Sequence, residues 1–186
     1  MKLVPIFDDD YCLLSTKGDH EKYSEFDKIF RNWTDIEYLD NFFSTHEKDL
    51  KRTIWENISI EQAIIETRNE AIKFRKYLKK LIKKLPDERI PLLLRLFKSL
   101  SNDVVTNHLF EKKKAYVNRN KTWLRIYALK AGEDMYIITG GAIKLTATME
   151  EREHTQAELR KLNTCRQFLI SEGIVDDDGV IELLEI

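Results

Sequence analysis

The chain has 186 residues, of which 42% are hydrophobic and 34% are charged, so its composition is that of a globular protein and not of a disordered one. Its apolar runs are far shorter than the roughly 20 residues that a membrane-spanning helix needs. Three aspartates at positions 8–10 stand where a secretory signal would carry its apolar core. With Cys12 and Cys165 far apart and expected to be reduced thiols, these features predict a cytoplasmic protein that is not bound to a membrane.

The net charge of −1 hides an uneven distribution along the chain. Residues 1–66 carry 8 basic and 15 acidic side chains, residues 67–130 carry 18 and 5, and residues 131–186 carry 5 and 12. A basic middle indicates a surface for a nucleic acid or an acidic partner. It is equally consistent with acidic flanks that fold over the middle and neutralise it.

The first elements are two short apolar runs at residues 2–7 and 11–15, on either side of the three aspartates. They predict a small hairpin in which Pro5 favours an edge position, because proline cannot donate a ladder hydrogen bond. We interpret the aspartates as a solvated turn and not as a metal site.

Residues 21–100 read as successive helices. Three capping boxes, in which a Ser or Thr and a Glu or Gln three residues later satisfy backbone donors, predict helix starts at Thr34 with Glu37, Ser44 with Glu47 and Ser59 with Gln62. The third helix is expected to run to about Leu85, with Pro86 ending it, and its apolar stripe comprises Ile64, Ile65, Ala71, Ile72, Leu78, Leu81, Ile82 and Leu85. Residues 90–100 predict one more short helix.

The long helix also carries many lysines on its other faces. One interpretation is an ordinary core-facing helix with a solvated basic face. The other is a helix that binds RNA or a membrane surface. The candidate nucleic-acid-binding residues are the lysines of this helix and of a later basic run: Lys76, Lys80, Lys83, Lys112, Lys113 and Lys114.

Strand signals begin after residue 102. An irregular strand is expected within 104–117, a strong one at 123–129, a turn at 131–134, and another strand at 135–139. Gly140 and Gly141 indicate unusual backbone angles or a close backbone approach, and residues 143–146 continue as strand or extended loop. Thr148 with Glu151 predicts the start of a closing helix that ends before Gly173. The last residues form a strand or a helix.

These elements predict an α+β fold, with a helical N-terminal half packed on a small antiparallel sheet of about three or four strands and a C-terminal helix. We expect two parts: residues 1–88, a mainly helical extension with a short hairpin, and residues 89–186, the α+β core. No internal repeat is present, and the four histidines are scattered, so no zinc site is expected.

The second half of the chain resembles the RelE/ParE superfamily of toxins, in particular its HigB-like, phage-derived branch. Members have a strand of the type L-R-I/L-x-Y/F, a turn, an apolar strand, then a glycine or aromatic and a K-x-T-like segment before a helix. The resemblance covers about residues 90–172. The matching residues are Leu124, Arg125, Ile126, Tyr127, Ile137, Ile138, Gly141, Lys144, Thr146 and Thr148.

This resemblance implies a toxin of a type II toxin-antitoxin system that cleaves messenger RNA or inhibits translation. In such an endoribonuclease the ribose 2′-hydroxyl attacks the adjacent phosphorus without a metal ion or cofactor. Arg125 and Lys144 would be the cations that stabilise the phosphate, and Tyr127 and His154 would serve in stacking or proton transfer. The implied partners are RNA or the ribosome and a cognate antitoxin protein.

Two other functions stay open. The same fold can act as a non-catalytic protein-interaction module, with the N-terminal helices as added surface. The basic helix 59–85 can also bind nucleic acid without cleaving it. Each candidate residue has a structural interpretation as well: Arg125 as a strand residue beside aromatics, and Lys144 as a lysine that guards a sheet edge against aggregation.

Overall fold

The structure, a computed structural model, describes residues 1–7, 11–52, 57–100, 110–116 and 122–185. Six strands form one sheet in the described part, in the order β1-β2-β6-β5-β4-β3. The strands are β1 (Lys2–Pro5), β2 (Leu13–Lys17), β3 (Phe97–Ser99), β4 (Glu111–Tyr116), β5 (Leu124–Ala131) and β6 (Met135–Ile143). The helices are α1 (Glu25–Thr34), α2 (Ile36–Thr45), α3 (Glu47–Leu50), α4 (Ile60–Leu81), α5 (Pro86–Leu96), α6 (Glu153–Ser171) and α7 (Asp177–Glu185).

The α+β class is confirmed, but the sheet is larger than expected and it is mixed. All neighbouring strands are antiparallel except β2 and β6, which pair in parallel from Leu13↔Tyr136 to Ser15↔Ile138. The N-terminal hairpin forms as predicted, and Pro5 lies in the edge strand β1, where its missing N–H costs no ladder bond. The three aspartates lie outside the described residues.

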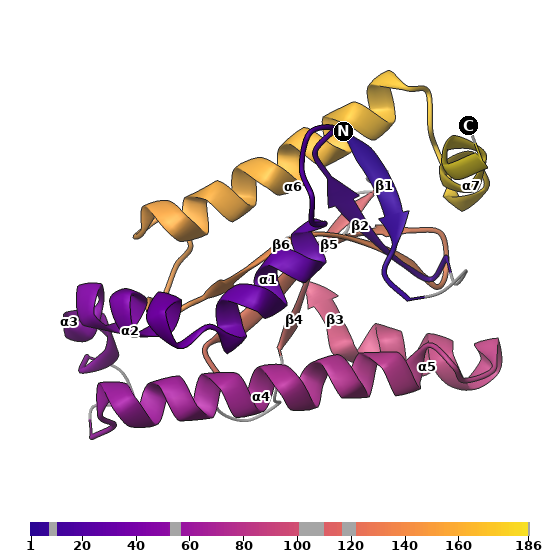
Figure 1. The fold of residues 1–186 in the computed structure, drawn as a ribbon. Coiled ribbons are helices and arrows are strands. Elements are labelled where there is room, and N and C mark those ends of the chain that lie inside the picture. The colour runs from indigo at the N-terminus through magenta and orange to yellow at the C-terminus, as the bar shows by residue number, and fades with distance from the viewer. Residues whose placement is uncertain (8–10, 53–56, 101–109, 117–121, 186) are drawn as a thin grey trace.

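Helices cover both faces of the sheet, and α4 and α6 lie on opposite sides of it (Figure 1). Successive strand residues point to opposite faces, so β5 and β6 contribute to two cores. On the α4-side face, Leu124, Ile126 and Ile138 pack with the helical core formed by α1, α2 and α4. On the α6-side face, Tyr127 and Leu129 pack with the buried residues of α6 and α7.

Of the predicted helix starts, the capping box of Ser59 and Gln62 is confirmed, with both backbone-to-side-chain bonds at 3.1 Å. The box at Thr34 is wrong. Thr34 is the last residue of α1, where its hydroxyl donates to the carbonyl of Phe30 at 2.7 Å. Asp35 caps α2 instead, because its carboxylate accepts from the N–H of Tyr38 at 3.0 Å and stands one residue later.

The boxes at Ser44 and Thr148 are also wrong. Ser44 lies inside α2, and α3 begins at Glu47 without a side-chain cap. The carboxylate of Glu151 does accept from the N–H of Thr148 at 2.6 Å, but α6 begins only at Glu153. The Thr148–Glu151 bond shows that such a pair can close a local turn without starting a helix.

The long helix α4 ends at Leu81 and not at Leu85, and Pro86 begins α5 where it was expected to end a helix. Proline suits the first helical position because the N–H that it lacks would have no partner there. Ile64, Ala71, Leu78, Leu81 and Ile82 are buried as predicted, whereas Ile65, Ile72 and Leu85 are exposed, so the apolar stripe is narrower than expected.

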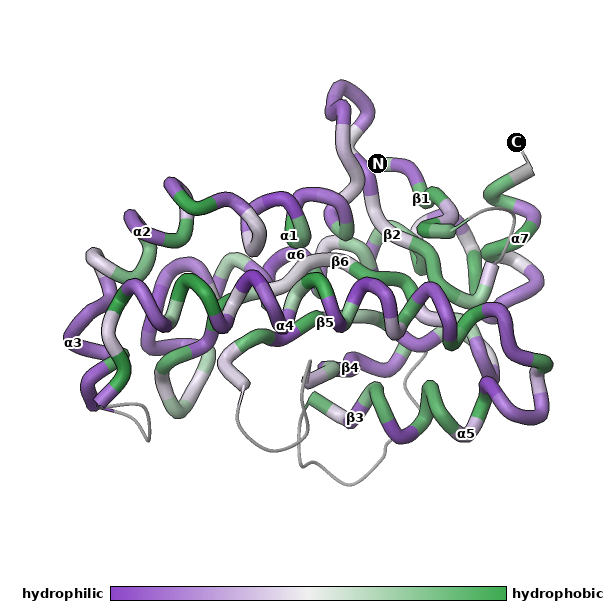
Figure 2. The backbone as a smooth tube through the Cα atoms, turned by 60° about the horizontal axis from the view of Figure 1, so that its bottom comes forward, coloured by the Kyte–Doolittle hydropathy of each residue, from purple (hydrophilic) through white to green (hydrophobic). Residues whose placement is uncertain are grey.

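The predicted helix at 90–100 was placed too late. α5 ends at Leu96, and the chain becomes extended at Phe97 to form β3. Phe97 is buried and lies across from Ala115 on β4. Of the irregular strand expected in 104–117, residues 111–116 form β4. The tube in Figure 2 shows β4 as largely hydrophilic, in contrast to the hydrophobic stretches of β5 and β6.

The turn between β5 and β6 forms as predicted, with Gly132 at φ +66°. Strand β6 continues straight through Gly140 and Gly141 with an irregular register opposite Tyr127. α6 ends just before Gly173, whose φ of +75° suits the C′ position, and α7 follows. None of the helices in the described ranges is both long and apolar enough to cross a bilayer.

Candidate nucleic-acid interface

Arg125 lies on β5 and faces the same side as α6, directly across from Tyr116 on β4. Its guanidinium carbon is 4.0 Å from the centroid of the Tyr116 ring, a close cation–π contact. Nη1 donates to the carbonyls of Thr122 at 2.6 Å and Leu124 at 3.0 Å. Burial lowers the pKa of Arg125 from its ordinary value, although the group stays charged. The guanidinium is therefore held in place by an aromatic ring and backbone carbonyls.

Lys144 follows the end of β6, where its N–H donates to the carbonyl of Trp123 at 2.8 Å. Its amino group donates to the carbonyls of Thr146 and Ala147, both at 2.5 Å. Burial lowers the pKa of Lys144, and the positive charges of Arg125 and Lys114 lower it further, while Glu151 opposes them. Arg125 and Lys114 thus both lie within electrostatic reach of Lys144.

Tyr127 is 1% exposed and lies on the same face, across from Lys114 on one side and Gly140 on the other. Its hydroxyl makes no hydrogen bond to any described residue. Burial raises the pKa of Tyr127, and the charge of Arg125 partly offsets that rise. The phenol therefore stays protonated at neutral pH, and its oxygen is buried.

His154 stands in the first turn of α6 and is directed away from this cluster. Its Nε2 lies 3.0 Å from the carbonyl of Ile143, so this nitrogen carries the proton. Its ring packs against those of Phe42 and His46 at centroid distances of 5.2 and 4.9 Å. Burial lowers the pKa of His154. These contacts join the end of β6 to α2 and α6.

The predicted nucleic-acid residues do not form one surface. Lys76 and Lys80 are exposed on α4, which lies on the opposite side of the sheet from α6, and Lys83 is exposed in the turn after α4. None of the three forms an ion pair with a described residue. Lys113 faces the α4 side and pairs with Glu111 at 2.5 Å. Lys112 and Lys114 face the α6 side, in register with Leu129 and Tyr127.

Neutralisation of the basic middle by the acidic flanks occurs at particular positions only. Arg75 pairs with Asp27 at 3.2 Å, and Arg89 pairs with Asp134 at 2.6 Å. The two other long-range pairs join the flanks to each other, since Arg152 binds both oxygens of Asp49 and Lys161 binds Glu25. The lysines on the outer face of α4 and on the α6 side of β4 are left without acidic partners among the described residues.

One cation of the α6-side face was missed by sequence reasoning. Lys98 on β3 lies directly across from Lys114 on β4. Like charges in this position destabilise a sheet. No sequence signal could have paired these two lysines, because residues 97–99 were assigned to a helix.

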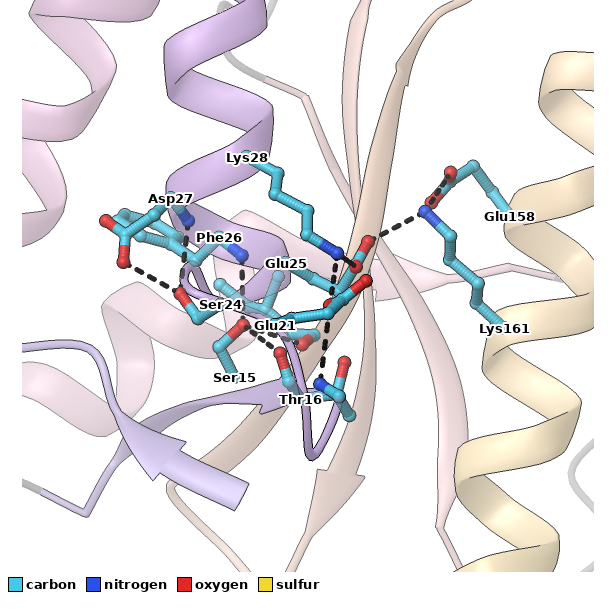
Figure 3. Close-up of polar contacts among 12 residues, drawn as sticks. Ser15, Thr16, Glu21, Ser24, Glu25, Phe26, Asp27, Lys28, Glu158 and Lys161 are labelled. Atoms are coloured by element: carbon cyan, nitrogen blue, oxygen red, sulfur yellow. Dashed lines mark hydrogen bonds and ion pairs between the residues drawn. The ribbon is translucent and has the colours of Figure 1, made fainter. Parts of the chain in front are cut away.

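A network of charged side chains between α1 and α6 was also missed (Figure 3). Lys28 forms ion pairs with Glu21 and Glu25. Lys161 forms ion pairs with Glu25 at 2.7 Å and with Glu158 at 2.9 Å. Glu158 is 6% exposed, and burial raises the pKa of its carboxyl group despite Lys161.

The partner of Glu158 on the sheet is Gly140. A Cβ atom at Gly140 would lie 1.7 Å from a carboxylate oxygen of Glu158, and one at Gly141 would lie 2.8 Å from the carbonyl oxygen of Arg125. The predicted close approach at the two glycines is therefore confirmed. The glycine pair was the signal that a polar group packs here, although it did not identify which one.

Other chemistry is not supported by the described residues. They contain no group of three or more His, Cys, Asp or Glu side chains placed to hold a metal ion. Cys12 and Cys165 are buried and form no disulfide, and burial raises the pKa of Cys165 to about 12, so Cys165 is not a reactive thiolate. The cationic face of β4, β5 and β6 is the arrangement with the clearest binding chemistry, since cations with spare N–H donors bind phosphate groups.

Comparisons with protein-family models, with curated proteins and with solved structures found no match to this chain.

Proposed function

We propose that the protein acts on RNA as a RelE/ParE-like toxin, with Arg125 and Lys144 as its phosphate-binding cations. One observation supports this above others. Arg125 and Lys114 both lie within electrostatic reach of Lys144, and none of the three forms a hydrogen bond to a carboxylate among the described residues. Acidic groups offset the mutual repulsion of these cations only in part, Glu70 at Arg125 and Glu150 and Glu151 at Lys144, and a bound phosphate would relieve it further.

The side chains keep enough hydrogen-bonding capacity for such a ligand. A lysine amino group has three N–H donors, and two of those of Lys144 are used by Thr146 and Ala147. A guanidinium has five donors, and Arg125 uses Nη1 for two carbonyls. The remaining donors would stabilise the negative charge that develops when a ribose 2′-hydroxyl attacks phosphorus.

The other two candidates take different roles in this proposal. Tyr127, whose hydroxyl is buried, would support the site from within the core and would not contact the RNA. His154 would hold the junction of β6 and α6 through the carbonyl of Ile143 and so position Lys144 next to it. An antitoxin that neutralises the protein would have to present acidic groups to this face.

The test is controlled expression in a bacterial host, with growth and transcript integrity measured for wild type and for Arg125→Ala/Lys144→Ala. The matched control is Lys76→Ala/Lys80→Ala, which removes the same charge from the other side of the molecule. We expect arrest and cleaved transcripts in wild type and control, and neither in the site variant. Arrest that survives in the soluble site variant would contradict the proposal.

A second function is favoured by the outer face of α4. Ile65 and Ile72 are 51% and 42% exposed and stand seven residues apart, next to lysines without ion pairs. This surface suits a non-catalytic interaction module with an acidic protein partner, or a nucleic acid bound without cleavage. The dependence of binding affinity on salt concentration distinguishes the acidic protein from the nucleic acid, because phosphate contacts make affinity fall steeply as salt rises. Loss of partner binding in Ile65→Asp/Ile72→Asp would support the protein partner.

A further inference from the structure

Strand β4 places alternate lysines of the run 112–114 on opposite faces of the sheet. Lys112 and Lys114 are half-buried on the α6-side face, while Lys113 is on the α4-side face with Glu111. Residues two apart on a strand are separated by about 6.6–6.8 Å. This spacing is comparable to that between consecutive phosphates of an extended nucleic-acid strand.

The row continues beyond the two lysines. Tyr116 is the next residue of β4 on the same face, and the guanidinium of Arg125 lies over its ring. Lys98 is across from Lys114, and the charge of Arg166 on α6 lowers the pKa of Lys112. Positive charge therefore follows the whole length of β4 on this side.

On the side of β4 and β3 the side chains of the row keep part of their surface exposed. α6 packs over β6 and β5 on this face. Lys98 is exposed, and Lys112, Lys114 and Tyr116 are each partly exposed. None of these lysines forms an ion pair with a carboxylate among the described residues. The amino group of Lys114 donates to the backbone carbonyl of Leu100 at 3.4 Å. Two lysines directly opposite each other are unfavourable for the sheet, and a bound phosphate would relieve their repulsion.

We propose that β4 is a track for single-stranded RNA, along which Lys112, Lys114 with Lys98, and Arg125 with Lys144 bind successive phosphates. Tyr116 adds an aromatic surface of the kind on which unpaired bases stack. The track leads toward Arg125 and Lys144, so this inference rests on the proposed function and specifies its substrate class and direction of approach.

A single strand fits these observations better than a duplex. The cations form one row along one strand, with an aromatic side chain in the same row. A duplex is recognised mainly by contacts to two phosphate backbones across a groove. The second basic surface, on α4, lies on the other side of the sheet and cannot contact the same duplex backbone as β4 (Figure 1).

Lys113 provides a matched control within the same tripeptide. Replacing Lys112, Lys113 or Lys114 by alanine changes the net charge equally. Only Lys112 and Lys114 face the proposed track, so a general electrostatic attraction would respond equally to all three changes, whereas the track would respond to two.

The experiment measures binding of a fluorescent single-stranded RNA of about 12 nucleotides, a length within the usual range of single-strand sites, and of the same RNA as a duplex. Anisotropy titrations at several salt concentrations give the slope of log K against log salt. For three or four phosphates we expect a slope of about −2 to −3, at about 0.7 per phosphate. Lys112→Ala and Lys114→Ala should each weaken binding about five-fold at about 0.1 M salt and make the slope shallower by about 0.7. Lys113→Ala should leave both unchanged.

The inference is overturned if Lys113→Ala weakens binding as much as its neighbours do, if the duplex binds as tightly as the single strand, or if no single strand binds at low salt. These outcomes differ from failure of the proposed function. Binding that follows the track without growth arrest would retain the track and reject the toxin. Arrest that depends on Arg125 and Lys144 without binding along β4 would reject the track alone.

Discussion

Gly140→Ala is expected to destabilise the protein through a single side chain, Glu158. The new Cβ would lie 1.7 Å from a carboxylate oxygen of Glu158, so this buried group would have to leave its position beside Lys161. Overpacking of this kind costs about 1–3 kcal/mol. The backbone itself is no obstacle, because Gly140 is not among the described residues with positive φ.

Making Gly140→Ala in a Glu158→Ala background tests whether the clash with the Glu158 carboxylate causes the loss of stability. With the carboxylate absent, alanine at 140 should be neutral or stabilising by about 0.4–1 kcal/mol, the usual gain from restricting the unfolded chain. Gly141→Ala is the control. Its Cβ would lie 2.8 Å from the backbone carbonyl of Arg125, which no side-chain replacement can relieve, so it should be costly in both backgrounds.

Urea unfolding followed by tryptophan fluorescence would measure these differences, since Trp33 and Trp123 are both 2% exposed. The four proteins of the cycle give a coupling free energy between positions 140 and 158. We expect about 1–3 kcal/mol. An equal cost of Gly140→Ala in both backgrounds would refute the account of why glycine stands here.

Two pH-dependent predictions concern the junction of α3 and α6. Both carboxylate oxygens of Asp49 accept hydrogen bonds from Arg152, which lowers the pKa of Asp49 below its usual value. The stability that this ion pair contributes is therefore present at neutral pH and is lost as the pH falls through the lowered pKa. Asp49→Asn should therefore lower the unfolding midpoint at pH 7, and the gap to wild type should close in acid; a constant gap would argue against the ion pair. Burial lowers the pKa of His154 below 6.5, so the fold favours the neutral ring and loses stability as the pH falls from about 6.5 through the folded value. His154→Gln should flatten the dependence of unfolding free energy on pH between about 7 and 5, and an unchanged profile would show that another group controls it.

Local rules predicted the elements whose causes are local. The box at Ser59 and Gln62 forms because both partners are three residues apart on an isolated helix start. The prediction of a cap at Thr34 was wrong because Asp35, one residue later, caps α2. Two adjacent candidate caps cannot be ranked without knowing where the previous helix ends. β3 was missed because its three residues continue the apolar spacing of α5, and only Ala115 across the sheet draws Phe97 into a strand.

The residues of the candidate site also divide into those that the sequence predicted and those that depend on distant contacts. Arg125, Tyr127 and Lys144 were identified from one short stretch, and strand alternation and sheet register place the first two on one face. The roles of Lys98 and Glu158 depend on contacts with residues more than ten positions away, so nothing near them in sequence distinguishes them from surface residues. Lys113 was grouped with its neighbours because a run of identical residues gives no hint of which face each one takes.

The parallel pairing of β2 with β6 has a consequence for how the molecule folds. The hydrogen bond from the Ser15 hydroxyl to the carbonyl of Ile138 joins groups 123 residues apart, and the sheet order makes β2 depend on a strand synthesised much later. Closing so long a loop is slow compared with local helix formation. During synthesis on the ribosome, one edge of the N-terminal hairpin therefore stays unpaired until β6 has emerged, which is most of the time needed to make the chain.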